Sequence, residues 1–316
     1  MVQRLLAALL FLLIAVRADT GEAAERMTVL LDWFVNPDHA ALIVARDAGF
    51  FERHGLEVEL IAPADPNDPP KLVAAGKADL AVSYQPQLHM QVAAGLPLVR
   101  VGTLVATPLN SLVVLDDGPI ETLADLKGRK IGFSIGGFEE TLLRTMLGRA
   151  GVALEEVELV NVNFSLSPAL IAGQVDAVIG AFRNFELNQM DIVGRPGRAF
   201  YPEEEGVPPY DELVLVAKTD TLDREKLARF LLALEEATTF LMNHPQSGWA
   251  LFVASDKALD DELNRRAWTD TLPRLALRPA ALDQGRYARF AAFMVESGMI
   301  PATGPVADYA IDVNAK

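Results

Sequence analysis

The sequence predicts an α/β protein of two lobes, each with a mostly parallel β-sheet flanked by helices. Three observations lead to this prediction. Between residue 27 and about residue 215, short apolar segments alternate with segments of helical spacing, which is the rhythm of β-α-β units. The same order of elements starts again near residue 123. After residue 220 the strand-like segments stop, and the chain ends in helices that we expect to pack back on the first lobe.

The first lobe opens with residues 27–33 (MTVLLDW), an apolar segment typical of a buried strand. A helix is expected over residues 37–50, because proline is favoured in a first helical turn and Asn36 can accept the first N–H groups. A second helix, at residues 68–76, also begins on prolines and ends at Gly76. The further strands of this lobe are expected at residues 56–63, 78–84, 96–105 and 110–115.

The second lobe begins with residues 123–151, which contain a helix start, a strand, a glycine turn and a helix. A strand at residues 157–163 and a helix–strand pair at residues 167–182 complete it. The chain then returns through the strand-like residues 211–220 and the helical segments 223–245, 258–272 and 279–298. Lobe one is therefore expected to comprise residues 25–115 and 208–316, and lobe two residues 116–207. Two crossings between the lobes would form a hinge beside a cleft.

The two lobes also share a local pattern. LVAAGKADLAVSY in the first matches ALIAGQVDAVIGA in the second without a gap, so that Gly76 aligns with Gly173 and Asp79 with Asp176. α/β proteins reuse such patterns, and the match can be a coincidence. The single ungapped offset favours two lobes of similar construction.

The composition excludes several classes of protein. With 51% hydrophobic and 22% charged residues in 316, the chain is expected to fold around a large core. A formal net charge of −15 repels nucleic acid and anionic lipid, so no nucleic-acid partner is expected. There is no cysteine and the four histidines are scattered, so we expect no zinc site, no metal and no cofactor. The chain is expected to be a monomer.

The N-terminus is typical of a secretory signal peptide. Arg4 precedes the apolar run of residues 5–16, which as a helix would span roughly 18 Å, short of the ~30 Å needed to cross a bilayer. Small residues follow in GEAAE, so residues 1–24 are expected to be removed near Ala24. The alternative is a short anchor that stays attached. Without a lipid-carrying cysteine, the mature protein is expected to be free in the periplasm.

Functional side chains are expected at the carboxyl ends of the strands, where open α/β sheets bind ligands. Four loops lie at such ends, at residues 33–39, 82–87, 133–141 and 181–186. Their side chains are aromatic, amide or acidic, with one arginine (Arg183) and no lysine. The candidate ligand-binding residues are Trp33, Asn36, His39, Ser83, Tyr84, Gly136, Phe138, Glu140, Phe182, Asn184 and Glu186.

These side chains suit a flat heterocycle that is neutral or cationic. An aromatic ring such as Trp33 stacks on a ligand ring for on the order of 1 kcal/mol beyond burial. A carboxylate such as Glu186 accepts charge-assisted hydrogen bonds from ring N–H and amino groups, worth ~1.5–3 kcal/mol. An anion would instead need arginine and free N–H groups. Gly136 and Gly137 offer some N–H groups, but the two glutamates beside them oppose an anion.

Structural roles compete with these assignments. Trp33 can be a core residue, and His39, on a first helical turn, can be a surface histidine or one satisfied inside the protein. Glu139 and Glu140 are favoured at a helix start by the helix dipole whatever the function. Asn184 can serve only to shape a turn.

The stretch LLDWFVNPDHAALIVARDAGFFERHGLEVEL, followed by GKADLAVSY, LKGRKIGFS and AGQVDAVIGAF, resembles the thiamine-pyrimidine precursor family. DWFVNPDH and SYQPQ are similar to the periplasmic formylaminopyrimidine-binding proteins that supply an ABC importer. The resemblance implies a type II periplasmic binding fold that closes on an aminopyrimidine, with an ABC permease as partner. It implies that Trp33, Asn36, His39 and Tyr84 contact the ligand from lobe one, and that Glu186 pairs with its amino edge from lobe two.

Two alternatives stay open. The same fold could bind a sulfonate, a flavin precursor or another small heterocycle. The chain could also be an enzyme, either hydrolytic or similar to the related fungal pyrimidine synthases, which carry a Schiff-base lysine at the end of the third strand and a cysteine-rich loop. Ser83 stands at that strand end here, and the chain has no cysteine, so imine chemistry is not expected.

Overall fold

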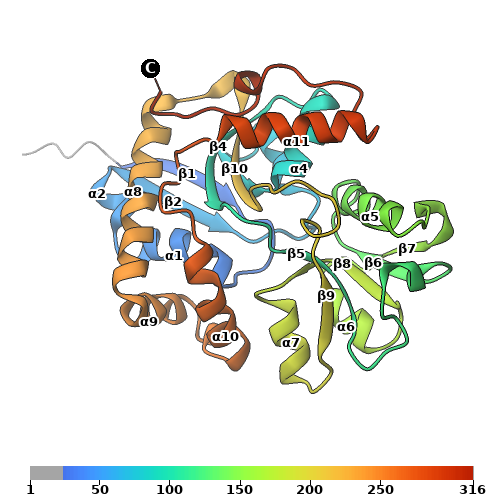
Figure 1. Cartoon of the computed structure of the whole chain (residues 1–316). Helices are drawn as coiled ribbons and strands as arrows, with labels where there is room; N and C mark the ends of the chain where they lie inside the picture. The colour runs from blue at the N-terminus through green and yellow to red at the C-terminus, as the bar shows by residue number, and fades with distance from the viewer. Residues whose placement is uncertain (1–23, 316) are drawn as a thin grey trace, which may run out of the picture.

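The computed structural model describes residues 24–315, and it confirms the two-lobed α/β fold (Figure 1). Each lobe is built on one five-stranded sheet with helices on its faces. The predicted signal peptide, residues 1–24, lies outside the described residues except for Ala24. No helix among residues 24–315 is long and apolar enough to cross a membrane.

The sheet of the first lobe has the strand order β2-β1-β3-β10-β4. Strands β1, β2 and β3 run parallel, whereas β10 is antiparallel to both of its neighbours, β3 and β4. The return of the chain from the second lobe thus adds a strand inside the first sheet rather than at its edge. The strands are β1 Glu25–Leu30, β2 Leu56–Ile61, β3 Leu80–Ser83, β4 Leu98–Val105 and β10 Leu213–Lys218.

The sheet of the second lobe has the analogous order β7-β6-β8-β5-β9. Strands β6, β7 and β8 are parallel, and β5 is antiparallel to β8 and β9. The strands are β5 Asn110–Leu115, β6 Lys130–Phe133, β7 Glu158–Asn161, β8 Ala177–Phe182 and β9 Gly197–Phe200.

Strand β5 differs from the sequence expectation. Residues 110–115 were assigned to lobe one, but they pair with β8 and β9 in the second sheet, so the first crossing between the sheets falls after Val105. Nothing in an apolar segment such as NSLVVL specifies its sheet, because that depends on partners distant in sequence. Strand β9 was not expected from the sequence at all.

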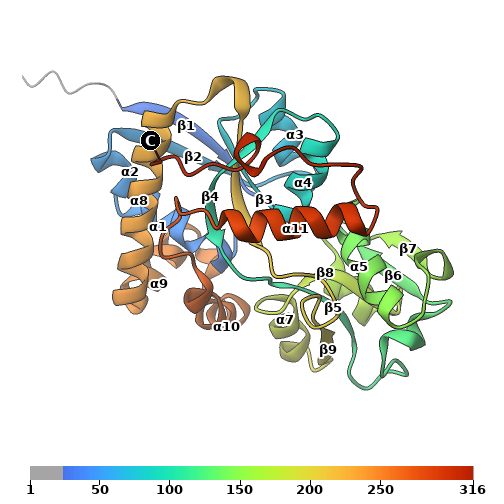
Figure 2. The same cartoon turned by 45° about the horizontal axis from the view of Figure 1, so that its top comes forward.

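Helices cover both sheets, and α8, α9 and α10 lie along the first lobe, as expected for the C-terminal part of the chain (Figures 1 and 2). The expected helix 37–50 is divided into a 3₁₀ turn at Pro37–His39, α1 and α2. Gly49, which adopts φ +71°, separates α1 from α2. Pro245 was expected to end a helix, and it also begins α9. The helices are α1 Ala40–Asp47, α2 Phe50–Arg53, α3 Pro69–Ala74, α4 Gln85–Ala93, α5 Phe138–Arg149, α6 Leu166–Ile171, α7 Glu186–Ile192, α8 Arg224–Asn243, α9 Pro245–Ser255, α10 Glu262–Thr271 and α11 Gln284–Glu296.

The repeated sequence pattern has a common structural role in the two lobes. The Asp79 carboxylate accepts the backbone N–H of Thr28 at 2.8 Å, and the Asp176 carboxylate accepts that of Lys130 at 2.8 Å. Each aspartate lies just before a central strand and ties it to the neighbouring parallel strand. The match between the two segments is therefore structural, and it places β3 and β8 in equivalent positions.

The two crossings between the lobes are joined by a buried glutamate. Glu212, on the second crossing, accepts the backbone N–H groups of Leu109 (2.6 Å) and Asn110 (2.9 Å) on the first crossing. Its side chain is fully buried, and burial raises its pKa to about 7. The hinge is thus held by side-chain bonds as well as by its two strands of backbone.

Candidate functional site

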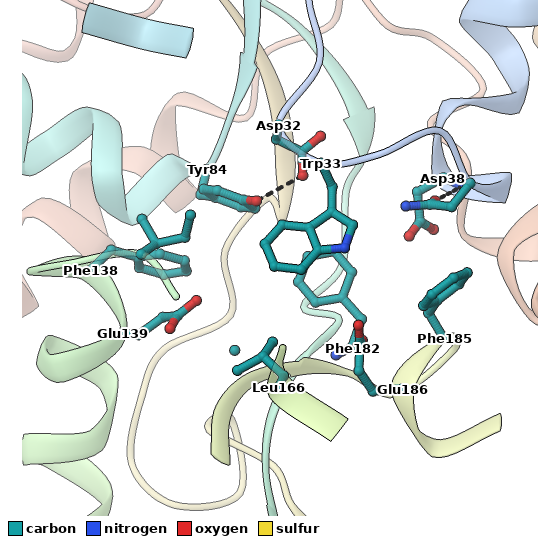
Figure 3. Close-up of a pocket in the computed structure, with 13 residues that line it drawn as sticks. Asp32, Trp33, Asp38, Tyr84, Phe138, Glu139, Leu166, Phe182, Phe185 and Glu186 are labelled. Carbon is teal, nitrogen blue, oxygen red and sulfur yellow. Dashed lines mark hydrogen bonds between the residues drawn. The ribbon is translucent and has the colours of Figure 1, made fainter. Parts of the chain in front are cut away.

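A pocket lies between the lobes, at the carboxyl ends of the central strands (Figure 3). The space among its lining atoms is about 430 Å³, which is within the range of small-molecule sites. Both lobes contribute side chains, and six of the 13 lining residues were candidates from the sequence. The lining residues are Asp32, Trp33, Asn36, Asp38, Tyr84, Ile135, Phe138, Glu139, Leu166, Gly180, Phe182, Phe185 and Glu186.

The turn after β1 is fixed by its own polar side chains. Asn36 accepts the N–H of Asp38 at 2.8 Å and so caps the 3₁₀ turn that begins at Pro37. The Asn36 N–H donates to His39 Nδ1 at 3.3 Å, which leaves His39 Nε2–H to donate to Asp32 at 2.9 Å. The second Asp32 oxygen accepts from the Tyr84 hydroxyl at 2.7 Å. Asp32 therefore orients both His39 and Tyr84 at the upper wall of the pocket.

Aromatic rings from the two lobes meet across the pocket. Tyr84 of the first lobe stacks on Phe138 of the second, with ring centroids 5.1 Å apart and planes at 19°. Phe182 meets Tyr84 edge-on at 6.4 Å. Trp33 lies in the middle of the pocket (Figure 3) and packs against Phe164 of the second lobe at 4.6 Å. Its indole Nε1 is buried and has no partner among the described residues, so it is free to donate to a ligand.

Four carboxyl groups line the pocket, those of Asp32, Asp38, Glu139 and Glu186, and burial raises the pKa of the last three. The pKa of Asp38 is raised to about 6, and those of Glu139 and Glu186 to about 8. One oxygen of Glu139 accepts the Ser134 N–H and one of Glu186 accepts the Phe182 N–H, both at 2.7 Å. The Asp38 Oδ2 atom has no partner among the described residues. The site thus offers hydrogen-bond acceptors to a ligand at three positions.

No arginine or lysine is among the residues that line this pocket in the described part of the chain. Arg183, the one arginine in the predicted loops, donates hydrogen bonds to the Glu203 carboxylate at 2.6 Å and to the Leu109 carbonyl at 3.3 Å. It therefore supports the hinge rather than the pocket. Buried anions require positive partners, so this lining favours a ligand that brings hydrogen-bond donors or positive charge.

The structure brings together the sequence candidates Trp33, Asn36, Tyr84, Phe138, Phe182 and Glu186. Three other candidates lie in the layer behind the lining. His39 supports Asp32, as described, and the Ser83 hydroxyl donates to Gln87 at 2.9 Å. Asn184 donates to Asp38 at 2.6 Å. Contact of these three with a ligand stays a prediction.

Gly136 and Glu140 lie beside the pocket without lining it. The Gly136 N–H donates to Asn67 of the first lobe at 3.0 Å. Glu140 lies on an outer groove with Met90 and Arg144, whereas its neighbour Glu139 lines the pocket. Direct contact of Gly136 or Glu140 with a ligand likewise stays a prediction.

The sequence candidates omit seven lining residues. Glu139 lies in one of the predicted loops without being a candidate, Asp32 directly precedes the loop at residues 33–39, and Asp38 lies within that loop. Strand-end position could have pointed to all three. Phe185 lies next to two chosen residues, but Ile135, Leu166 and Gly180 are apolar and carry no polar signal.

Side-chain amides join the lobes on both sides of the pocket. Asn184 of the second lobe donates to Asp38 and, at 2.7 Å, to Thr271 of α10. On the other side, Asn67 of the first lobe donates to the Ser134 carbonyl at 3.1 Å. The residues that would bind a ligand and those that hold the lobes together are therefore adjacent.

In the described part of the chain, no group of three or more His, Asp or Glu side chains could hold a metal ion. Comparison with known proteins shows that residues 36–248 match the family described as NMT1/THI5 like. The chain is 56% identical over 292 residues to a protein of Haemophilus influenzae whose name connects it with thiamine biosynthesis, covering 92% of this chain and 93% of that one. It is 36% identical over 230 residues to the formylaminopyrimidine-binding protein of Halalkalibacterium halodurans, covering 72% and 70%.

More distant relatives include the 4-amino-5-hydroxymethyl-2-methylpyrimidine phosphate synthase of Legionella pneumophila, 24% identical over 84% of this chain and 86% of that one. Among solved structures, the alkanesulfonate-binding protein SsuA from Xanthomonas axonopodis pv. citri bound to MOPS matches with a TM-score of 0.71. It covers 92% of this chain and 98% of that one at 16% identity, a likeness that establishes the fold.

Proposed function

From the premise that this chain belongs to the NMT1/THI5-like family and has the two-lobed fold of solute-binding proteins, we propose a ligand for the pocket between its lobes. The chain captures an aminopyrimidine precursor of thiamine that is similar to formylaminopyrimidine. Trp33 provides the aromatic surface for the ring, and Glu186 accepts from the amino edge. Asp38 and Glu139 offer further acceptors, and the Trp33 Nε1–H is available for a ring nitrogen.

The observation that carries this proposal is the pairing of aromatic rings with buried carboxyl groups in a pocket that has no basic lining residue among those described. An aminopyrimidine is flat, rich in N–H donors and weakly basic. It can therefore stack on the aromatic rings and donate hydrogen bonds to the carboxyl groups of the pocket. Carboxylate–amine hydrogen bonds in such a site are worth ~1.5–3 kcal/mol each, and ring stacking adds ~0.5–1.5 kcal/mol. Together these contributions are compatible with micromolar or tighter binding, about −8 kcal/mol.

A sulfonate ligand is the main alternative within the same fold. A buried sulfonate needs positive or N–H partners. The carboxyl groups that line this pocket offer no such partner, and Arg183, the arginine of the predicted loops, is bonded to Glu203. The sulfonate alternative is therefore disfavoured.

A pyrimidine synthase activity is the alternative from another class. A pyridoxal-dependent reaction that uses the chain itself for the imine needs an amine in the site. The third strand, β3, ends at Ser83, whose hydroxyl is buried and bonded to Gln87. We therefore propose capture and release of the ligand, without chemistry, as the function.

Delivery to an ABC permease and a periplasmic location complete the proposal. The signal-like residues 1–24 supply the route of export, and the hinge bridged by Glu212 allows the lobes to separate and close around a ligand. A permease that recognises the closed form would take up only loaded protein.

Calorimetric titration of the purified chain tests this function directly. Formylaminopyrimidine and hydroxymethylpyrimidine are expected to bind with Kd of about 1 μM or below, and taurine is expected to show no heat of binding. Incubation with pyridoxal phosphate is expected to give no imine absorbance band. Tight taurine binding, or an imine band with turnover, would contradict the proposal.

A further inference from the structure

We propose that Glu139 is the residue that makes this site reject ligands bearing a phosphate or sulfonate group, because its side chain occupies the position where such an anion would bind. This inference rests on the proposed function and narrows its ligand class to pyrimidines without an anionic substituent. The sequence candidates included the neighbouring Glu140 instead.

The loop before α5 has the features of an anion-binding loop. It follows a central strand, contains two glycines and leads into a helix of 12 residues, with Gly137 at φ +81°. Backbone N–H groups in such loops, together with the start of the helix dipole, commonly bind phosphate and related anions. An anion that entered this pocket would therefore be expected to bind here.

Two N–H groups of this loop, those of Ser134 and Gly136, are occupied by the protein's own acceptors. The Glu139 carboxyl group turns back and accepts the Ser134 N–H at 2.7 Å. The Gly136 N–H is taken by the Asn67 side chain of the first lobe at 3.0 Å. Whether ionised or protonated, the Glu139 carboxyl keeps the Ser134 N–H from a ligand. An anion that bound this N–H would have to displace the carboxyl group.

Gly180 provides the room for Glu139. A Cβ atom on Gly180 would lie 2.6 Å from the carboxyl carbon of Glu139, and the φ of Gly180 is +99°. The carboxyl group therefore lies against bare backbone of β8, where a side chain from the strand would exclude it. A glycine weakens a central strand, and at this position it leaves the space that the Glu139 carboxyl group occupies.

The surroundings of Glu139 strengthen the rejection of anions. Glu186 of the pocket and Glu212 of the hinge face it, and both raise its pKa in addition to the larger effect of burial. Among the described lining residues no arginine or lysine offsets them. An anion in this pocket would therefore give up its hydration without gaining a cationic partner.

The test compares hydroxymethylpyrimidine with its phosphate ester in calorimetric titrations of the full chain. Wild-type protein is expected to bind the ester at least about 100-fold more weakly than the free alcohol. Glu139→Ala, which frees the Ser134 N–H, is expected to reduce this ratio at least tenfold, whereas the isosteric Glu139→Gln, whose amide oxygen can still accept that N–H, is expected to keep it. Glu155→Gln, a surface acid paired with Arg144, is the control for the loss of one charge and should keep the wild-type ratio.

Two results would overturn the inference: an unchanged ratio in folded Glu139→Ala, or a reduction of the same size in Glu140→Ala. Circular dichroism and melting curves verify that each variant is folded, and Glu139→Ser, which also removes the carboxyl group, serves if Ala does not fold. The proposed function fails separately, if wild-type protein does not bind the free alcohol at all.

Discussion

The side-chain amide of Asn184 donates a hydrogen bond of 2.6 Å to the Asp38 carboxyl group, which joins the second lobe to the first at one end of the ligand pocket. The same amide reaches Thr271, so one side chain bonds two segments of the opposite lobe. Since Asp38 also lines the pocket, the bond between the lobes and the lining of the pocket share one carboxyl group. Closure and binding are therefore expected to be coupled energetically.

Removing this bond should weaken ligand binding through the closed state. Asn184→Ala is expected to lower the affinity for formylaminopyrimidine about tenfold and to increase the radius of gyration, because the closed form loses two buried hydrogen bonds. Calorimetry and small-angle scattering measure the two effects. Asn243→Ala, at the exposed end of α8, is the control. Unchanged affinity with an unchanged radius would show that Asn184 does not hold the lobes together.

Trp33 and Glu186 should carry much of the affinity. Glu186→Gln is expected to weaken binding of an aminopyrimidine by about 10- to 100-fold, because a charge-assisted acceptor is lost. Trp33→Ala should weaken it at least as much, since a buried ring is removed from the middle of the pocket. Glu155→Gln, exposed on the second lobe, should have no effect in the same titrations. If both site variants bind like wild type, the ligand lies elsewhere.

The buried carboxyl groups predict a distinctive pH dependence of stability. Glu139 and Glu186, with pKa raised from 4.5 to about 8, hold protons in the folded state at pH values where the unfolded chain has lost them. The free energy of unfolding of ligand-free protein should therefore fall as the pH rises from 6.5 to 8. Below pH 6.5, buried His89, with its pKa lowered to about 4, acts in the opposite direction, so that range is not diagnostic.

Urea unfolding at pH 6.5, 7.2 and 8.5 measures this slope. Glu186→Gln should flatten it, because the variant has one fewer proton to lose. A stability that rises over this interval in wild-type protein would contradict the assignment of raised pKa values to the pocket carboxyls.

Gly180 should tolerate substitution poorly. Gly180→Ala combines a left-handed φ of +99° with a Cβ atom 2.6 Å from the Glu139 carboxyl carbon, and is expected to destabilise the fold by about 1–3 kcal/mol. Gly148→Ala, on the exposed face of α5 with open space around its Cβ, should instead stabilise by about 0.5–1 kcal/mol. Thermal melts compare the two. Equal effects would mean that the contact with Glu139 imposes no constraint.

The sequence was sufficient for the fold and for the loops that meet at the pocket, because strand ends are marked by a change from apolar to turn-forming residues. It was not sufficient for the direction of single side chains. Glu139 and Glu140 differ by about 100° around α5, so which of them faces the pocket depends on the residue where the helix starts. The sheet of β5 and the approach of Leu166 to the pocket depend on contacts between distant segments, which no local pattern encodes.

The contact between Tyr84 and Phe138 has a consequence for kinetics. Their rings touch across the boundary of the lobes at a centroid distance of 5.1 Å, whereas a flat molecule inserted between two rings requires about 7 Å. Entry through this side must wait for the lobes to separate. In stopped-flow mixing, the observed rate of capture should therefore level off at high ligand concentration, at a plateau equal to the speed at which the molecule opens.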